Sequence, residues 1–508
     1  MARRGSSRRA RRERPASQNS TAPAYITRKI PYYDFLGDEA LERIEQQADW
    51  LLEHVGVEFR DDAHALALWK EAGAEIDGVR VRMPDGMART LCQTIPKQFT
   101  QIARDPKHNV KIGERHTVFA PNYGSPFVRD LDEGRRYGTL NDFQNLVKLV
   151  YRAKWLHHSG GTVVEPCDVP VNKRHLDMVY AHMRYSTKPF LGSITQKDRA
   201  EESIAMTRIL FGDDVVDNNC CIMGNVNANS PLMFDKVATE AIQVYCENNQ
   251  GIIVAPFILG GAMGPVTTAA AVAQALAEGM AAGAYSQLVR PGAPFVLGNF
   301  LSSMSLKSGA PTFGMPEPVT SNYAIGQLAR RLGVPLRCGG SLTASKLCDA
   351  QAAYESADSM HSTALGGANY VLHSAGWLEG GLTVGYEKLM LDVDRLGGLQ
   401  RMLTAGLATD DNALAADAYE EVDPGNHFLG CSHTMRNYET AFYDAELSDS
   451  ESFEQWSETG SKEAVQRANE RVKRELNEYE APPIDDAIDD ALRDYIARTK
   501  ASRDDAWY

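Results

Sequence analysis

The sequence lacks a long apolar run, an excess of positive charge and any regular spacing of metal-binding residues. No stretch approaches the roughly 18 consecutive apolar residues that a membrane-spanning helix requires. The net charge of −14 disfavours a nucleic-acid-binding protein, because phosphate contacts need a basic face. With 43% hydrophobic and 24% charged residues, the composition is typical of a globular protein. We therefore expect neither a membrane nor a nucleic acid as a partner.

The cysteines give no sign of a disulfide framework. Eight cysteines are scattered along the chain without C-x-x-C spacing, and in a chain of this length that indicates reduced thiols. No His/Cys cluster has the spacing of a zinc site, so no metal is predicted, although ligands from distant strands could still meet in the fold.

The first 14 residues, MARRGSSRRARRER, are the basic exception. They favour a solvated, disordered tail over residues 1–25, the alternative being an arm that binds nucleic acid or a membrane. The arginine pairs resemble an export signal, but no apolar segment follows them. We therefore expect a cytoplasmic protein.

The middle of the chain alternates short β-prone runs with helix-like stretches rich in Ala, Leu and Glu. This rhythm predicts a parallel sheet, and eight units favour a closed TIM (β/α)8 barrel over an open sheet. No G-x-G-x-x-G follows a strand, so a dinucleotide fold has no support. The runs begin at Thr117, Trp155, Pro189, Cys220, Ile252, Pro294, Val334 and Asn369.

The expected fold class is thus α/β, with three parts after the tail. Residues 26–116 form a helical cap on account of an apolar stripe that includes Leu36, Leu41 and Leu52. Residues 117–400 form the barrel. Residues 401–508 form a mostly helical extension, in which opposite charges recur four residues apart.

A barrel of this kind carries its active site at the carboxyl ends of the strands. Here those ends are rich in amides, aromatics and glycines, but they have few carboxylates and no lysine. That composition disfavours a Schiff-base aldolase or a paired-carboxylate glycosidase. Lys346 is the nearest lysine and is better explained as a surface or loop-pairing residue.

Aromatic rings beside neutral polar groups suit a trimethylammonium group, which has no hydrogen-bond donor and is held by cation–π attraction and shape. A quaternary amine is also a good leaving group under in-line attack, so the reaction needs neither a metal nor a general acid. Each ring alone is more often a packing residue, so only convergence in one pocket would support this interpretation. The candidate rings are Tyr123, Phe257, Phe300, Phe313, Tyr354 and Trp377.

Several stretches together resemble the trimethylamine methyltransferase family, from about residue 30 to the end of the chain. They are GNVNANSPLMFD (224–235), APFILGGAMGPVT (255–267), GGSLTASKLCDAQAAYES (339–356), SAGWLEGGLTVGYEKLMLD (374–392) and GNHFLGCSHT (425–434). The resemblance implies a TIM barrel that docks a separate corrinoid protein and transfers a methyl group to its Co(I) centre.

The family's first-described members carry pyrrolysine and use trimethylamine. In this chain the corresponding place, within 339–346, holds ordinary amino acids. Members without pyrrolysine include glycine betaine, proline betaine and carnitine methyltransferases. A quaternary amine needs no pyrrolysine ring to occupy a nitrogen lone pair, so the resemblance implies a quaternary amine as substrate.

A betaine would add a carboxylate, which needs a cation or a donor, and Arg337, His158 and His373 are the candidates. The alternative is that Arg337 points outward as a salt-bridge residue and that both histidines are satisfied core groups. No catalytic residue is assigned. The predicted substrate-binding set is Tyr123, His158, Asn225, Phe257, Asn299, Phe300, Arg337, Tyr354, His373, Trp377 and Glu379.

The chain shows no D-x-H-x-x-G signature of a corrinoid-binding domain, and the nearest match, from Asp62 to His64, lacks the glycine. We therefore expect this chain to bind no cofactor itself and a partner protein to supply the corrinoid (cobalamin). A homo-oligomer is also expected. Two alternatives stay open: direct methyl transfer to a folate or thiol acceptor, and a non-catalytic betaine-binding sensor.

Overall fold

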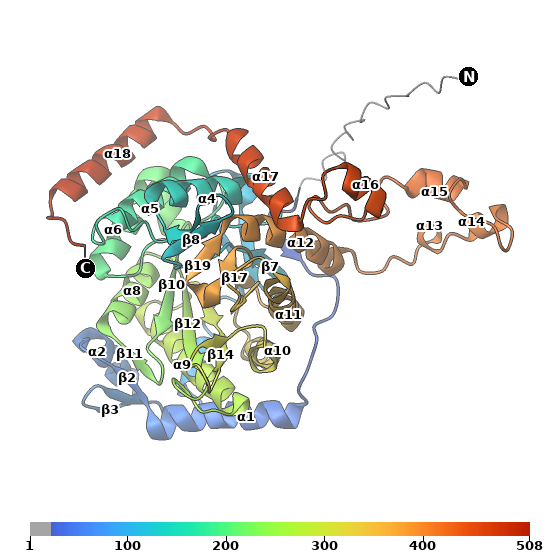
Figure 1. Ribbon diagram of the computed structural model, residues 1–508. Coiled ribbons are helices and arrows are strands. Elements are labelled where there is room, and N and C mark those ends of the chain that lie inside the picture. The colour runs from blue at the N-terminus through green and yellow to red at the C-terminus, as the bar shows by residue number, and fades with distance from the viewer. Residues whose placement is uncertain (1–21, 508) are drawn as a thin grey trace, which may run out of the picture.

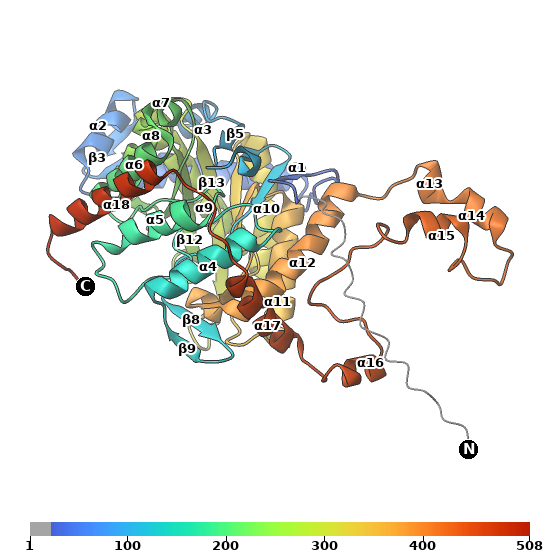
Figure 2. The same cartoon turned by 90° about the horizontal axis from the view of Figure 1, so that it is seen from above.

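The computed structural model describes residues 22–507 and shows an α/β fold (Figures 1 and 2). Most of the predicted tail, residues 1–25, lies outside the described residues. Its last residue is ordered against the body, because the Tyr25 ring meets His116 edge-on at 5.1 Å between ring centroids.

Six parallel strands form the centre of the molecule. In spatial order each strand pairs with the next in parallel, from β10 to β12, β13, β16, β17 and β7. They coincide with six of the eight predicted runs, and their residues are almost all buried. The bounds are Met223–Ala228 (β10), Gly251–Leu259 (β12), Phe295–Gly298 (β13), Leu336–Gly339 (β16), Tyr370–Leu372 (β17) and His116–Phe119 (β7).

The other two predicted runs, which begin at Trp155 and Pro189, are extended segments without regular strand pairing. They still connect β7 to β10 by backbone hydrogen bonds: His157 N–H to Phe119 O (2.9 Å), Leu191 N–H to Gly160 O (2.8 Å) and Gly192 N–H to Met223 O (2.8 Å). Gly160, at φ +89°, and Pro189 interrupt the ladder, because neither a left-handed residue nor a proline continues a strand.

Helices follow the strands and pack around the sheet, as the alternating pattern predicts. The longest, α9, is buried along most of its length because α1 and α3 cover its outer side. The helices are α4 (Leu140–Arg152), α5 (Arg174–Tyr185), α6 (Lys197–Phe211), α8 (Lys236–Glu247), α9 (Thr268–Val289), α10 (Pro316–Leu332), α11 (Ala350–Gly366) and α12 (Tyr386–Ala405).

The predicted helical cap over residues 26–116 needs correction, because it contains strands as well as helices. Its helical segments are α1 (Asp38–Trp50), the π-helix Leu51–Val55, α2 (Ala63–Glu71) and α3 (Met87–Cys92). Between them lie strands of two to four residues, too short to show a clear period in sequence. These strands are β1 (Ile26–Thr27), β2 (Val57–Phe59), β3 (Glu75–Asp77), β4 (Arg80–Arg82), β5 (Gln98–Gln101) and β6 (Val110–Gly113).

Additional short strands build the loops at the carboxyl ends of the parallel strands. They are β8 (Phe127–Asp130) and β9 (Gly134–Tyr137) after β7, β14 (Phe300–Met304) and β15 (Pro311–Thr312) after β13, and β18 (Trp377–Leu378) and β19 (Thr383–Gly385) after β17. β18, β19, β8 and β9 form one small sheet.

The C-terminal extension is mostly helical where it is regular. It comprises α13 (Asp411–Leu414), α14 (Ala416–Glu421), α15 (Ser432–Asn437), α16 (Phe453–Glu458), α17 (Ala464–Asn477) and α18 (Asp486–Ala501). Helix α17 packs on α12 and α4, and α18 packs on α5 and α6. Across residues 22–507, no helix combines the length and the apolar character needed to cross a membrane.

Candidate functional site

Four aromatic rings and one imidazole converge at the carboxyl ends of the parallel strands. Phe300 in β14 is the central ring, with Phe257 at 5.1 Å, Phe313 at 5.9 Å, His373 at 5.4 Å and Trp377 at 5.9 Å between ring centroids. Trp377 also meets His373 at 4.4 Å and Phe313 at 5.4 Å. We call these five side chains the aromatic cluster.

The loop after β17 is fixed in place by its backbone. His373 adopts a left-handed conformation, with φ +59°, and its N–H donates to Pro121 O at 3.0 Å. Gly376, at φ +97°, donates its N–H to the Asp392 carboxylate at 2.9 Å. The Trp377 indole N–H donates to Thr343 O at 3.1 Å. The rings of His373 and Trp377 are therefore oriented by contacts to three other segments.

Arg337 lies in β16 directly beside this cluster and is fully buried. Its guanidinium stacks on the Phe300 ring at 5.0 Å from the centroid. Nη1 donates to Asn299 O at 3.2 Å and Nη2 donates to His373 Nε2 at 3.0 Å, while Nε has no partner within residues 22–507. Burial lowers its pKa to about 10, and no carboxylate is among the groups that influence it.

The hydrogen bond from Arg337 sets the protonation of His373. Because Nε2 of His373 accepts, the ring is neutral and its proton lies on Nδ1, a tautomer inferred from the network. Burial and the neighbouring Arg337 hold the pKa of His373 well below its usual value. Nδ1 has no partner among the described residues, so its N–H is a free donor in the buried site.

Five unpaired polar atoms belong to residues within or just after five different parallel strands. Buried polar side-chain atoms without a partner are rare in folded proteins and need an explanation. The Asn299 side chain donates to Asn322 on α10, so it points to the side of the sheet opposite to the Phe300 ring. A bound polar or charged molecule at the strand ends would explain the other four atoms. The five atoms are Asn122 Oδ1, Asn225 Oδ1, Asn299 Oδ1, Arg337 Nε and His373 Nδ1.

Two further predicted residues, His158 and Tyr123, lie outside the aromatic cluster. His158 is fully buried, and its ring contacts Gln101 Oε1 at 3.1 Å and the Tyr370 hydroxyl at 3.2 Å. It is therefore a satisfied core histidine, which was the alternative reading of the sequence. Burial raises the pKa of Tyr123 to about 12, and Arg337 is close enough to influence it electrostatically.

Tyr354 and Glu379 do not join the cluster. Tyr354 lies on α11 with 53% of its surface exposed. Glu379 accepts hydrogen bonds from Arg135 Nε at 2.7 Å and Thr383 Oγ1 at 2.7 Å, so its carboxylate already has structural partners. Lys346 donates to the nearby Ala344 carbonyl, at 3.0 Å. The sequence order of these residues could not show which way each side chain points.

The predicted substrate-binding set omitted Asn122, which lies beside Gly376 at a strand end, and Asn322, which contacts Asn299 from α10. Asn122 follows β7, and its Nδ2 donates to Ser125 Oγ at 2.8 Å, leaving its oxygen free. Asn322 on α10 accepts from Asn299 Nδ2 at 3.0 Å and so orients that amide. The strand-end position of Asn122 was a usable signal, whereas Asn322 lies in a helix and carries none.

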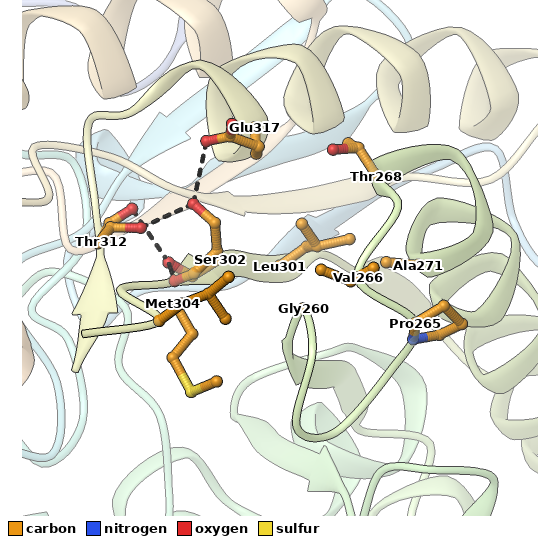
Figure 3. Close-up of a pocket in the computed structure, with 12 residues that line it drawn as sticks. Gly260, Pro265, Val266, Thr268, Ala271, Leu301, Ser302, Met304, Thr312 and Glu317 are labelled. Atoms are coloured by element: carbon orange, nitrogen blue, oxygen red, sulfur yellow. Dashed lines mark hydrogen bonds between the residues drawn. The ribbon is translucent and has the colours of Figure 1, made fainter. Parts of the chain in front are cut away.

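A separate cavity of about 270 Å³ lies between β14 and the starts of α9 and α10 (Figure 3). Leu301, Ser303, Thr268 and Glu317 are among its lining residues. The five side chains of the aromatic cluster are not among the residues that line it. This cavity is therefore distinct from the aromatic cluster.

Comparisons with known proteins agree with these motifs. The family described as trimethylamine methyltransferase matches residues 2–504. A glycine betaine methyltransferase of Desulfitobacterium hafniense is 36% identical over 92% of this chain and 98% of its own length. A trimethylamine methyltransferase of the same species is 25% identical over 91% of this chain and 93% of its own.

A proline betaine:corrinoid methyltransferase of Eubacterium limosum is 24% identical over 93% of this chain and 99% of its own length. Among solved structures, the monomethylamine methyltransferase of Methanosarcina barkeri aligns with 90% of this chain and 97% of that chain, at 11% identity and a TM-score of 0.46.

Proposed function

The chain belongs to the trimethylamine methyltransferase family, and from this premise we propose that it transfers a methyl group from a betaine to the Co(I) corrinoid of a partner protein. One observation supports a betaine as the substrate. Arg337 is a fully buried cation beside the aromatic cluster, and the part of the chain that the structure describes offers it no carboxylate partner. A ligand that offers both a quaternary ammonium group and a carboxylate would match both features.

The aromatic cluster supplies the binding surface for the ammonium group. A cation over aromatic faces in a desolvated site gains about 2 kcal/mol or more. Phe300 and Trp377 belong to the cluster, and the unpaired amide oxygen of Asn122 adds partial negative charge. A quaternary ammonium group has no N–H proton to donate, and none of these side chains has to accept one.

Arg337 and His373 supply the carboxylate site. The unpaired Nε–H of Arg337 and the unpaired Nδ1–H of His373 are both buried donors. A carboxylate that accepted from them would neutralise the guanidinium and satisfy two orphaned groups, and charge-assisted bonds of this kind are the stronger ones.

The reaction requires this chain only to position the substrate. The electron pair of the Co(I) acceptor attacks a methyl carbon, the carbon–nitrogen bond breaks, and its electron pair stays on nitrogen. The products are a tertiary amine and the methylated acceptor, without a net proton transfer. Holding the ammonium group so that one methyl faces the acceptor in line is therefore the main task of this chain.

The relatives support the assignment of substrate and acceptor. Identity is higher to the glycine betaine methyltransferase, at 36%, than to the trimethylamine methyltransferase, at 25%. The proline betaine relative is named for its corrinoid acceptor. Within this chain Asp62, the start of the incomplete corrinoid motif, caps α2 and bonds to Thr239 and Gln243, which supports a corrinoid supplied by a separate partner.

We also propose that the eight βα units close into a TIM (β/α)8 barrel. The hydrogen bonds that run from β7 through residues 157–160 and 189–192 to β10 support a continuous ring. In such a barrel the cluster would lie at the carboxyl-end face, where barrel active sites occur. The cytoplasmic location remains a prediction.

Calorimetric binding to a small panel tests the substrate assignment. The panel is glycine betaine, proline betaine, carnitine, choline and trimethylamine, followed by methylation of cob(I)alamin with any ligand that binds. We expect one betaine to bind well above choline and trimethylamine. Arg337→Gln should weaken that betaine by at least about 2 kcal/mol, or roughly thirtyfold, with choline affinity little changed.

Other outcomes would contradict the proposal in distinct ways. Binding without any methyl transfer would indicate a sensor, and transfer to a folate or thiol in place of cob(I)alamin would indicate a different acceptor. Equal losses for betaine and choline in Arg337→Gln would remove the carboxylate assignment.

A further inference from the structure

A long arm, residues 406–442, projects from the body between α12 and α16 (Figures 1 and 2). It carries α13, α14 and α15, which have four, six and six residues, whereas an isolated helix needs about 12–15 residues to persist in water. Only Ala418 and Cys431 among its apolar residues are buried. The arm therefore has almost no core of its own.

The arm instead exposes its large apolar side chains. Eight of them are exposed, and Leu407, Phe442 and Leu429 are the most accessible at 91%, 86% and 79%. At about 100 Å² each they offer roughly 800 Å², which is about what one partner contributes to a standard protein interface. Apolar exposure on this scale marks an interaction surface.

The position of the arm separates it from the aromatic cluster. The arm begins just after α12, where Leu403 O accepts from Lys29 N–H at 2.9 Å, and the neighbouring β1 pairs with the start of β7. The base of the arm thus lies towards the amino ends of the parallel strands, whereas the cluster lies at their carboxyl ends. A corrinoid protein that reaches the cluster does not need this surface.

A second exposed apolar surface lies on the same side of the molecule, close to the base of the arm. It consists of Tyr33 and Phe35, which are half-exposed and contact the Tyr323 ring on α10 at 4.7 and 6.2 Å between centroids. We call these three residues the N-terminal aromatic patch. Tyr33 and Phe35 follow Lys29 in the chain by four and six residues, and Tyr33 N–H donates to Leu365 O on α11 at 3.1 Å, so every copy carries the patch on the same side as the base of its arm.

We propose that the arm docks on the N-terminal aromatic patch of a second copy of this chain. A two-fold axis between copies would let each arm cover the patch of the other, so that both apolar surfaces are buried at once. Each arm offers roughly 800 Å², of which the three residues of the patch would cover part, so the contact falls in the range of a standard protein interface. This inference does not depend on the substrate or the acceptor.

Light scattering and sedimentation of the full-length chain test the proposal. We expect a dimer, or a multiple of it, at micromolar concentration. The double variant Leu429→Asp/Phe442→Asp should weaken association by at least about thirtyfold, because buried apolar hot-spot residues carry about 2 kcal/mol or more. Val266→Asp is the matched control, since Val266 is 69% exposed before α9, and it should leave the assembly unchanged.

A cross-linking experiment locates the contact. Leu429→Cys and Phe35→Cys variants, each prepared alone and then mixed, should form an interchain disulfide that is enriched in the mixture. A monomeric wild-type chain, or an assembly that survives the double aspartate variant, would overturn the proposal. Loss of transfer to the corrinoid protein by that variant, with free cob(I)alamin still methylated and no change of assembly, would overturn it in favour of a partner-binding arm.

Discussion

At the scale of single residues, the placement of Arg337 is hard to explain by stability. A buried charge costs several kcal/mol unless a partner compensates it, and this guanidinium has only a carbonyl, an imidazole and an aromatic face around it. Its lowered pKa expresses that cost. A site that must attract an anion would retain such a residue, because the ligand supplies the missing charge.

The pH dependence of betaine binding follows from this placement. Arg337 loses its proton as the pH rises through about 10, and a neutral guanidinium cannot balance a carboxylate. His373 stays neutral above its lowered pKa, so it adds no step near neutrality. We expect calorimetric affinity to be level from pH 7 to 9 and to fall about tenfold per pH unit above 10. A loss that starts near pH 7 would point to a histidine instead.

The aromatic cluster gives a second prediction for single side chains. Trp377→Leu should weaken betaine binding by about 2 kcal/mol, or roughly thirtyfold, because one cation–π face is lost while the volume stays apolar. Tyr354→Leu is the matched control, since that ring is exposed on α11. Isothermal titration of both variants checks this. Comparable losses in the two would contradict the placement of the site.

At the scale of elements, α12 holds the loop that carries His373 and Trp377. Lys388 Nζ contacts both Asp392 oxygens at 2.6 Å and Ser356 Oγ at 3.0 Å, and this pair is buried. Asp392 in turn accepts from the Gly376 N–H at 2.9 Å. Burial raises the pKa of Asp392 in spite of Lys388, so the carboxylate depends on its partners to remain charged.

Removing one member of this pair should be costly. We expect Lys388→Met to lower the free energy of unfolding by about 3 kcal/mol, because it leaves a buried carboxylate uncompensated. The double variant Lys388→Met/Asp392→Leu should recover part of that loss, since it buries no unpaired charge. Urea unfolding followed by circular dichroism measures both. A double variant less stable than the single one would show that the Gly376 contact outweighs the charge effect.

At the scale of the whole molecule, the proposal that this chain binds the substrate while a partner protein supplies the corrinoid can be tested by kinetics. The purified chain should carry no corrinoid, and its rate with free cob(I)alamin should rise linearly with cob(I)alamin concentration. With the partner corrinoid protein the rate should saturate at micromolar concentration, because a docking surface adds affinity that the free acceptor lacks. Absorbance of the methylated corrinoid follows both reactions. A chain that purifies with bound corrinoid would refute this arrangement.

The sequence by itself determined the α/β class and most of the central strands. Short β-prone apolar runs separated by helical stretches are local patterns, and six of the eight expected strands form where they predict. The two runs at Trp155 and Pro189 form no regular strands, because the local glycine and proline geometry overrides the apolar pattern. The family motifs are also local, and they indicated a methyltransferase before any contact was known.

Only the tertiary structure decided which residues meet. Phe257, Phe300 and Trp377 are more than 40 residues apart in sequence, and their convergence depends on strand order and register. Side-chain direction separated buried Arg337 from exposed Tyr354. Hydrogen bonding separated His373, whose Nδ1 has no partner among the described residues, from the satisfied His158. The apolar side chains of the arm read as ordinary helix residues in sequence. Only the three-dimensional structure shows that these side chains do not pack against the body and are therefore exposed.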